Sequence, residues 1–471
     1  MKGKSNGAAA PGMKQNNDFL GTEPLGKLLF QLALPAVTAQ LINMLYNIVD
    51  RIYIGHMPGD GSLALTGLGV CLPVILIVSA FAALVSMGGA PRSSIFMGKG
   101  DTESAEKTLG GCFTLLLILA AVLTAVLLIF GERMLWVFGA SENTIGYAAS
   151  YLKIYALGTG FVQLTLGMNA YINAQGFAKT GMFTVLIGAV CNIVLDPIFI
   201  FGLHLGVQGA ALATILSQGV SAVWVLKFLT GEKTILRLQK KNMNLQPKIV
   251  LPCVALGLAP FVMQASESII MVCFNASLQK YGGDLAVGAM TILSSMMQFS
   301  MLPLQGLGQG AQPITSYNFG AGNKERVKKS FFLLLGVSLA YSVVLWALVM
   351  LFPRVFAGIF TDNAALLDYA SQALRVYNGA MLIFGIQIAC QMTFIAIGNA
   401  GASVIVAVMR KCGLLLPLIY ILPRLLPDPT MAVYRAEPVA DVIAVTFTAI
   451  LFFFQFRKAL RNMDKAAARP V

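Results

Sequence analysis

Twelve apolar runs divide this chain, and they constrain its fold more than any motif does. A helix needs roughly 20 apolar residues to cross the hydrocarbon core of a bilayer. Continuous runs of this length predict helices, because a helix satisfies its own backbone hydrogen bonds in lipid. We therefore expect an all-α polytopic membrane protein with twelve transmembrane helices. The expected spans are residues 28–54, 64–88, 108–130, 147–170, 182–203, 209–229, 249–275, 286–312, 331–352, 369–396, 402–422 and 438–456.

The composition and the distribution of charge agree with this class. The chain is 57% hydrophobic and 11% charged, whereas soluble domains carry about 25% charged residues. The net charge of +13 comes largely from basic clusters at 233–248, 324–329 and 457–469, which lie on one side of the expected topology. This asymmetry follows the positive-inside rule and predicts a multi-pass protein of the plasma (inner) membrane with both termini cytoplasmic. No basic stretch is interleaved with aromatic residues, so we expect no nucleic-acid partner.

The chain contains an internal repeat in which position n matches position n+222, and each half holds six expected spans. An even number of spans gives the halves the same orientation, related by a pseudo-twofold axis along the membrane normal. We expect two pseudo-symmetric six-helix bundles. The matched pairs include Ala64 with Ala286, Gly88 with Gly310, Pro91 with Pro313, Gly98 with Gly320, Gly100 with Gly322, Lys107 with Lys329, Phe138 with Phe360, Tyr147 with Tyr369, Tyr155 with Tyr377 and Gly176 with Gly398. The predicted divisions are a cytoplasmic segment 1–27, an N-lobe 28–229, a cytoplasmic linker 230–248, a C-lobe 249–456 and a cytoplasmic tail 457–471.

Two parallel lobes around a central cleft favour secondary transport, because two such bodies can rock against each other. A channel or a membrane receptor is the alternative from another class. The sequence has no GxxxxGK[ST] motif and no nucleophile–base set, so we expect neither an enzyme nor a nucleotide-driven pump. Energy would then come from an ion gradient. The seven cysteines lie within spans without ligand-like spacing, so we expect no disulfide, no cofactor and no metal centre other than a possible Na⁺ site.

A polar stripe in the first span ends in an intramembrane acid. Gln40, Asn43, Asn47 and Asp50 are spaced 3, 4 and 3 residues apart, which places them on one helix face. Acids inside a membrane are costly and are functional candidates by default. Asp50 is therefore a predicted ion-coupling residue. The three amides are either substrate-binding residues or make hydrogen bonds between helices.

A second acid, Asp196, lies in the fifth span with Asn192 one turn before it and Pro197 directly after it. Proline cannot donate a backbone hydrogen bond and loosens the preceding turn. Thr214 in the sixth span offers another oxygen. Such an all-oxygen set suits a proton or Na⁺. The predicted ion-coupling set is Asp50, Asn192, Asp196 and Thr214.

The repeat places this coupling in the N-lobe. With a two-residue shift from the main offset, Pro197 matches Pro417 and Asp196 matches Leu416. A carboxylate with a purely structural role could be expected in both lobes, whereas here only the proline persists.

The third intramembrane acid is Glu267 in the seventh span, with Gln264 one turn before it. We expect both to bind substrate, and we expect Glu267 to share one cleft with the other two acids. The alternative is a structural acid paired with Arg410 or Lys411. These two bases lie mid-span and are expected either to snorkel or to neutralise an acid. Asp441, near the end of the last expected span, is expected to reach water.

The eighth span combines methionine with glutamine, including Met297 and Gln298. A methionine stripe is either helix core or an adaptable wall for varied apolar ligands. We include Met297 and Gln298 among the candidate substrate-binding residues on the second interpretation.

The strings YNIVDRIYIG, NIVLDPIFI and GVQGAALAT, with the turns GKGD and GAGN, resemble multidrug and toxic compound extrusion (MATE) transporters over nearly the whole chain. The resemblance implies two six-helix bundles that export amphipathic, often cationic compounds by alternating access, in antiport with H⁺ or Na⁺. It places the family's cation site on the predicted ion-coupling set. A further acid that some members carry in the tenth span has no counterpart between residues 369 and 396. A lipid or lipid-linked glycan flippase is the alternative within transport. The expected partners are the lipid bilayer and amphipathic small molecules. We expect the protein to be a monomer.

Overall fold

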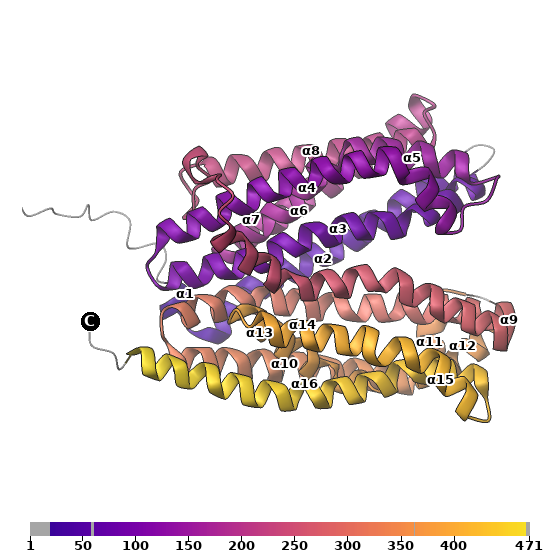
Figure 1. The fold of residues 1–471 in the computed structure, drawn as a ribbon. Helices are drawn as coiled ribbons and strands as arrows, with labels where there is room; N and C mark the ends of the chain where they lie inside the picture. The colour runs from indigo at the N-terminus through magenta and orange to yellow at the C-terminus, as the bar shows by residue number, and fades with distance from the viewer. Residues whose placement is uncertain (1–18, 58–60, 362, 468–471) are drawn as a thin grey trace, which may run out of the picture.

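The N-lobe is built from the first helices of the chain. The computed structural model describes residues 19–57, 61–361 and 363–467, and these contain no β-strand. A short helix, α1, precedes the first span and lies beside the start of the bundle (Figure 1). The elements are α1 (Phe19–Thr22), α2 (Leu25–Gly55), α3 (Gly61–Gly98), α4 (Thr102–Val137), α5 (Ile145–Leu157), α6 (Thr159–Ala174), α7 (Ala178–Pro197), the π-helix η1 (Ile198–Gly202) and α8 (Val207–Thr230).

The C-lobe follows a short connection and packs beside the N-lobe (Figure 1). The connection holds one 3₁₀ turn, η2 (Lys240–Asn242). The remaining elements are α9 (Pro247–Gly320), α10 (Lys324–Leu351), α11 (Pro353–Gly358), α12 (Ala364–Tyr377), η3 (Met381–Ile383), α13 (Phe384–Ala396), α14 (Ala400–Val408), the π-helix η4 (Met409–Leu415), α15 (Leu416–Leu425) and α16 (Pro429–Ala467).

The helices of the described ranges account for twelve spans. Nine of these helices are long and apolar enough to cross a membrane, and α12 with η3 and α13 forms a tenth span bent by 45°. The long helix α9 counts once in that number but holds two spans, because Gly283 (φ 64°, ψ −159°) breaks it. Helices α5 and α6 meet at Gly158 and together form the twelfth span of this count, which is the fourth along the chain. The predicted all-helical, twelve-span membrane fold is confirmed.

Equivalent glycines confirm the internal repeat. Gly100 (φ 76°) ends the turn before α4, and its partner in the repeat, Gly322 (φ 73°), ends the turn before α10. Gly176 (φ 89°) and Gly398 (φ 76°) occupy a second matched pair of turns. All four adopt the left-handed region, which glycine enters without a side-chain clash. The two halves therefore reverse direction with the same backbone geometry.

Matched hydrogen bonds show the same relation within the helices. The Ser94 hydroxyl donates to the carbonyl of Ala174 at 2.7 Å, and the Ser316 hydroxyl donates to the carbonyl of Ala396 at 2.9 Å. The two donors are partners in the repeat, and so are the two acceptors. The two six-helix bundles are thus built on one plan.

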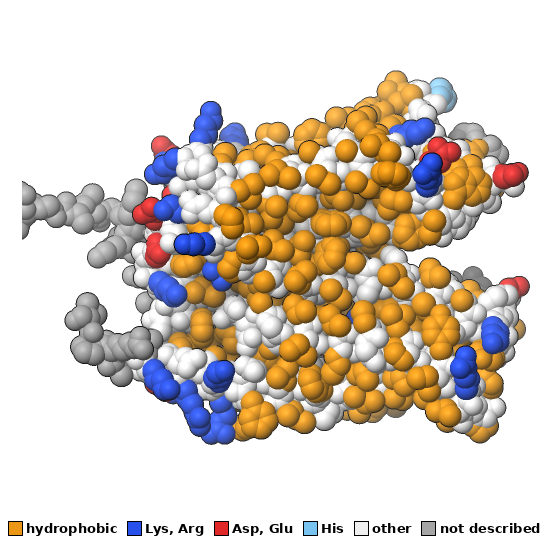
Figure 2. All heavy atoms as spheres, viewed as in Figure 1, with side chains coloured by type: hydrophobic (Ala, Val, Ile, Leu, Met, Phe, Trp, Pro, Cys, Tyr) orange, Lys and Arg blue, Asp and Glu red, His pale blue; other side chains and the backbone are white. Residues whose placement is uncertain are grey.

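The two lobes meet backbone to backbone at the end where α1 and the last turns of α16 lie, called here the α1 end (Figure 1). A Cβ atom on Gly98 would lie 2.0 Å from the carbonyl oxygen of Tyr317, and one on Gly320 would lie 2.0 Å from that of Ile95. These contacts are related by the repeat, so the seal is itself pseudo-symmetric. Figure 2 shows the lobes parting toward the opposite end.

Hydrophobic side chains cover the middle of the molecule, and charged side chains gather at its two ends (Figure 2). Many large apolar residues on this surface are exposed, such as Phe30 at 65% and Phe454 at 65%. A continuous exposed apolar belt of this kind is typical of a surface that faces lipid. The chain is a multi-pass membrane protein.

The side chain of Asp101 caps the N-terminus of α4, and its contribution to stability can be measured. Its carboxylate caps the helix by accepting a hydrogen bond from the Ser104 amide at 3.0 Å, as Asn323 does for the Arg326 amide at 3.2 Å before α10. We expect Asp101→Ala to lower the free energy of unfolding by about 1 kcal/mol at pH 7, whereas Asp101→Asn should lose less. Thermal unfolding in detergent would measure both. Equal losses in the two variants would show that the cap is not what stabilises this turn.

The same cap predicts a pH dependence. Hydrogen bonds from Ser104 hold the pKa of Asp101 below its usual value. A carboxyl whose pKa is lower in the folded state stabilises the fold above the unfolded pKa, about 3.9, and this contribution is lost as the pH falls through the folded pKa. The difference in stability between the wild type and Asp101→Asn should therefore change only below about pH 4.

Candidate functional site

Two acids meet inside the N-lobe where α2 packs on α7. Asp50 lies near the end of α2 and is 8% exposed, and Asp196 lies at the end of α7 and is fully buried. Because α2 packs on α7, the two carboxyl groups are close enough to interact with each other. Two buried carboxylates this close repel each other unless a proton or a cation lies between them. Two members of the predicted ion-coupling set, Asp50 and Asp196, are thus neighbours in the fold.

The end of α7 is shaped to present Asp196. Asn192, one turn earlier, donates from its side-chain amide to the Asp196 carboxylate at 3.2 Å. Pro197 removes the next backbone donor, and the helix continues as the π-helix η1, in which the Leu203 amide bonds the Ile198 carbonyl at 2.8 Å. Single π turns often occur at functional sites.

A narrow cavity of about 40 Å³ lies between α2, α6, α7 and α8. Its lining includes Asn43, Asn192 and Thr214, so three residues singled out from the sequence surround one space. The Thr214 hydroxyl also donates to the Ala210 carbonyl at 3.0 Å, which leaves its oxygen lone pairs available. The volume suits a water molecule or a small cation and excludes a drug-sized ligand.

Several side-chain oxygens in this region lack a hydrogen-bond donor among the described residues. They include Asp50 Oδ1, Asn192 Oδ1 and Asp196 Oδ2, and Oε1 of Gln218, which lines the cavity. Buried polar atoms are nearly always satisfied, and each of these atoms is an acceptor. The set therefore fits a proton or a cation and does not fit an anion.

The polar stripe of α2 divides between two environments. Gln40 lies at the contact between the lobes, where its side-chain amide approaches Gln309 Oε1 at 3.4 Å. Asn43 lines the N-lobe cavity. Asn47 is exposed and donates to the Asn43 carbonyl at 2.6 Å. Sharing one helix face did not place the three amides in one site, because the face runs from the seal into the cleft.

In the C-lobe, Glu267 of α9 forms an ion pair with Lys411 of η4, with 2.8 Å between Oε2 and Nζ. The Lys411 side chain is buried and the Glu267 side chain is half-exposed. Gln264, one turn before Glu267, is exposed. Of the two expectations for Lys411, neutralisation of an acid is confirmed and snorkelling is wrong, because the ammonium points to the protein interior.

Arg410 forms a second buried cluster with α16. Its guanidinium donates to Asp441 at 2.8 Å and to Glu437 at 3.2 Å, and it lies over the ring of Phe384 at 4.7 Å. The expectation that Asp441 reaches water is wrong: the residue is 3% exposed, because α16 begins at Pro429 and buries it three turns inside the helix. Glu437 was not among the expected site residues, although its four-residue spacing from Asp441 places both on one helix face.

The three intramembrane acids do not share one site. Asp50 and Asp196 lie inside the N-lobe, whereas Glu267 is paired within the C-lobe. Met297 is partly buried against two C-lobe clusters, which fits a core residue, and Gln298 beside it is exposed.

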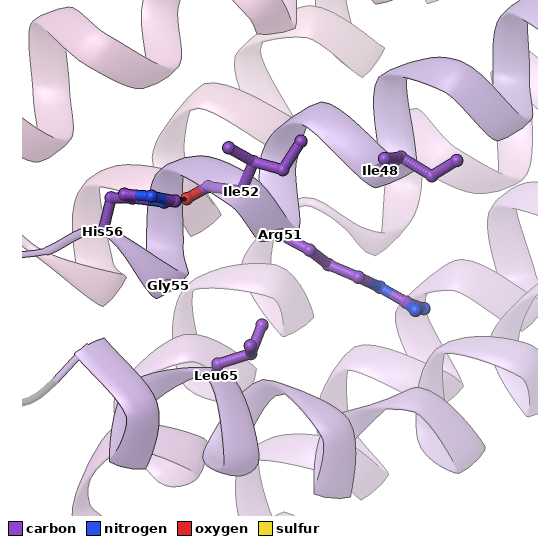
Figure 3. A pocket seen from close by; sticks show the side chains of 6 residues that line it. All are labelled: Ile48, Arg51, Ile52, Gly55, His56 and Leu65. Atoms are coloured by element: carbon purple, nitrogen blue, oxygen red, sulfur yellow. Dashed lines mark hydrogen bonds between the residues drawn. The ribbon is translucent and has the colours of Figure 1, made fainter. Parts of the chain in front are cut away.

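A larger hollow of about 520 Å³ lies between the end of α2 and the start of α3 (Figure 3). It is lined by Ile48, Arg51, Ile52, Gly55, His56 and Leu65. Figure 3 shows Arg51 extending from α2 along the space between the two helices. No sequence pattern marks this hollow, because it depends on how α2 and α3 diverge.

Known proteins match this chain along both of its lobes. The MatE family model matches residues 35–198 and 260–421. Multidrug export protein MepA of Staphylococcus haemolyticus (strain JCSC1435) is 25% identical over 444 residues, which cover 94% of this chain and 96% of that protein. Multidrug export protein MepA of Staphylococcus aureus (strain NCTC 8325 / PS 47) is 25% identical over 410 residues, covering 86% and 89%.

Solved structures share the fold. A crystal structure of MATE in the bent conformation superposes with a TM-score of 0.88 at 22% identity, covering 97% of this chain and 100% of that one. An outward-facing conformation of a multidrug resistance MATE family transporter of the MOP superfamily gives 0.85 at 23% identity, covering 96% and 99%. The family model matches well over half of the chain, in both lobes, and this protein therefore belongs to the MatE family of MATE transporters.

Proposed function

We propose that this protein is a secondary active multidrug exporter that exchanges H⁺ or Na⁺ for amphipathic, often cationic compounds. The observation that carries the proposal is the buried pair Asp50 and Asp196, whose free oxygens lack donors within the described chain. The MepA relatives, described as multidrug export proteins, support the substrate class. The proposed ion-coupling residues are Asp50, Asn192, Asp196 and Thr214.

The geometry supports a coupling step in α2. The lobes are sealed at the α1 end, and the cleft opens at the other end (Figure 2). A proton or Na⁺ that reaches Asp50 and Asp196 removes their repulsion and lets α2 repack against α7. Asn43 and Asn47 lie on α2 two turns and one turn before Asp50, so the same movement changes the wall that faces substrate.

Glu267 supplies the matching feature for a cationic substrate. It lies half-exposed on α9, with the exposed Gln264 one turn away, and Gln298 is exposed on the following span. We include Asn47 in the proposed substrate surface, and we place Gln40 at the seal that must open. A flippase for pyrophosphate-linked lipids would need a cationic cleft, and these acids and amides do not provide one.

In the proposed orientation, the α1 end lies on the cytoplasmic side of the plasma (inner) membrane. Basic side chains gather at this end, as Figure 2 shows, and the positive-inside rule assigns it to the cytoplasm. A monomer that works in the bilayer with amphipathic small molecules stays our prediction.

Purified protein in liposomes tests the proposed function. We expect ethidium to move against its own gradient when an inward H⁺ or Na⁺ gradient is imposed, with pH and Na⁺ varied separately to identify the ion. A one-for-one exchange of H⁺ or Na⁺ for the monovalent ethidium cation moves no net charge, so the concentration gradient of the ion drives it. A tenfold ion gradient supplies about 1.4 kcal/mol, enough for about a tenfold dye gradient. Dye that only equilibrates, with or without an ion gradient, would indicate a channel and contradict the proposal.

A further inference from the structure

The repeat relates the Glu267–Lys411 pair to the N-lobe acid pair. The main offset of the repeat carries Asp50 to position 272, and Glu267 lies five residues before it. The shifted offset carries Asp196 to Leu416, and Lys411 also lies five residues before that position. Five residues correspond to about 7.5 Å along a helix. Both members of the C-lobe pair are therefore displaced by the same number of residues from the positions equivalent to Asp50 and Asp196.

The two sites differ in what faces the acid. In the N-lobe two carboxyl groups face each other, and their free oxygens lack a donor among the described residues. In the C-lobe the carboxylate of Glu267 meets the ammonium of Lys411 at 2.8 Å. Equivalent helices of the two lobes thus carry two facing acids in the N-lobe and an acid paired with a lysine in the C-lobe.

Glu267 lies on the face of α9 that points toward the other lobe. Nearer the α1 end, Gly257 on this face packs against the N-lobe, and Phe261 contacts Phe81 of α3 edge to face at 5.0 Å. Gln264 follows one turn after Phe261 on the same side of the helix, and Glu267 lies one turn beyond Gln264. Both are exposed, so this face leaves the seal and enters the cleft between the lobes.

The residue before Lys411, Arg410, fixes this part of the chain through ion pairs with α16. Neighbouring residues on a helix point to different sides of it, so Arg410 reaches α16 while Lys411 reaches α9. Arg410 is fixed by Asp441 and Glu437, and both of its partners are buried. The π-helix η4 therefore holds the Lys411 ammonium against Glu267. The Lys411 side chain is buried, whereas the Glu267 side chain is half-exposed to the cleft.

We propose that Lys411 is a tethered competitor for Glu267: a cationic substrate binds this acid by displacing the lysine ammonium, which makes Lys411 a specificity-determining residue of the cleft. The proposal rests on the proposed function only for the substrate class. Competition lowers the affinity for every cation by a common factor and does not affect neutral ligands. Substrates that also cover apolar area beside Glu267 tolerate this loss better than small hydrophilic cations do.

Ligand binding to the purified full-length protein tests this inference. We expect Lys411→Met to bind ethidium about fivefold more tightly than the wild type, because about 1 kcal/mol of ion pairing no longer competes. A neutral fluorescent amphiphile, N-phenyl-1-naphthylamine, should bind unchanged. In a Glu267→Gln background the Lys411→Met substitution should have no effect on ethidium. Lys153→Met, at an exposed lysine of α5, is the matched control.

Lys411→Arg provides a variant that keeps the cation if Lys411→Met folds poorly. It should retain the wild-type preference between ethidium and the neutral probe. Weaker binding of both probes by Lys411→Met, or a gain that persists without Glu267, would overturn the inference. The binding assay needs no ion gradient, so failure of ion-driven transport with this binding pattern intact would reject only the proposed function.

Discussion

The Asp196→Asn variant should fold and reach the membrane but lose ion-driven export. Asparagine keeps the size of the side chain and can still bond Asn192, which donates to Asp196 at 3.2 Å in the wild type. It cannot take up a proton or balance the charge of a cation. Coupling free energies of about 1–3 kcal/mol correspond to about 5- to 150-fold, so we expect uphill export to fall by about 100-fold. Initial rates of ethidium export from liposomes at a fixed gradient would measure this.

The control for this variant is Asp284→Asn, which changes an exposed acid that accepts a hydrogen bond from Gln279 in α9, outside the N-lobe. It should export as well as the wild type. Downhill equilibration of dye by Asp196→Asn would show that its cleft still binds ligand. If Asp196→Asn accumulates dye like the wild type, Asp196 is not the coupling acid, and the Asp50→Asn variant would then show whether the other carboxyl acts alone.

The fold was predictable from the sequence because lipid leaves few alternatives. Continuous apolar runs can only be helices in a bilayer, and the repeat determined the relation between the lobes. The start of the last helix was not predictable in the same way. Arg435 and Glu437 lower the mean hydropathy before residue 438, so the expected span began there, whereas α16 begins at Pro429. Hydropathy counts each charge alone, whereas the fold pairs Glu437 and Asp441 with Arg410.

The candidate site shows the same division between local and tertiary information. Asn192 and Asp196 could be paired from sequence because they lie one turn apart on one helix. The contribution of Gln218 to the cavity could not be predicted, because it depends on how α7 and α8 rotate against each other. The role of Glu267 was open for the same reason: only the packing of η4 on α9 shows that Lys411, and not Arg410, is its partner.

Substitution of Gly257 should have the largest effect on conformation. A Cβ atom at this position would lie 1.7 Å from the carbonyl oxygen of Leu84, and one on Gly88 would lie 1.8 Å from that of Cys253. Both clashes are with backbone, which cannot move aside as a flexible side chain can. We expect Gly257→Leu to prevent the lobes from meeting at the α1 end and to abolish export. Reversing a two-state population from 99:1 to 1:99 takes about 5.5 kcal/mol, which a clash of this severity would exceed.

Distances between spin labels on the two lobes at the α1 end would measure the shift, with longer distances expected in Gly257→Leu. The matched control is Gly336→Leu in α10, where a Cβ atom would meet nothing within 4 Å. Leucine favours helix over glycine at both positions, so a difference between the variants reports the contact and not helix propensity. If Gly257→Leu exports normally and its labels stay close, the lobes do not need this backbone contact to seal, and the closed end must be held by α2 against the second half of α9, where Gly310 packs on Ala33.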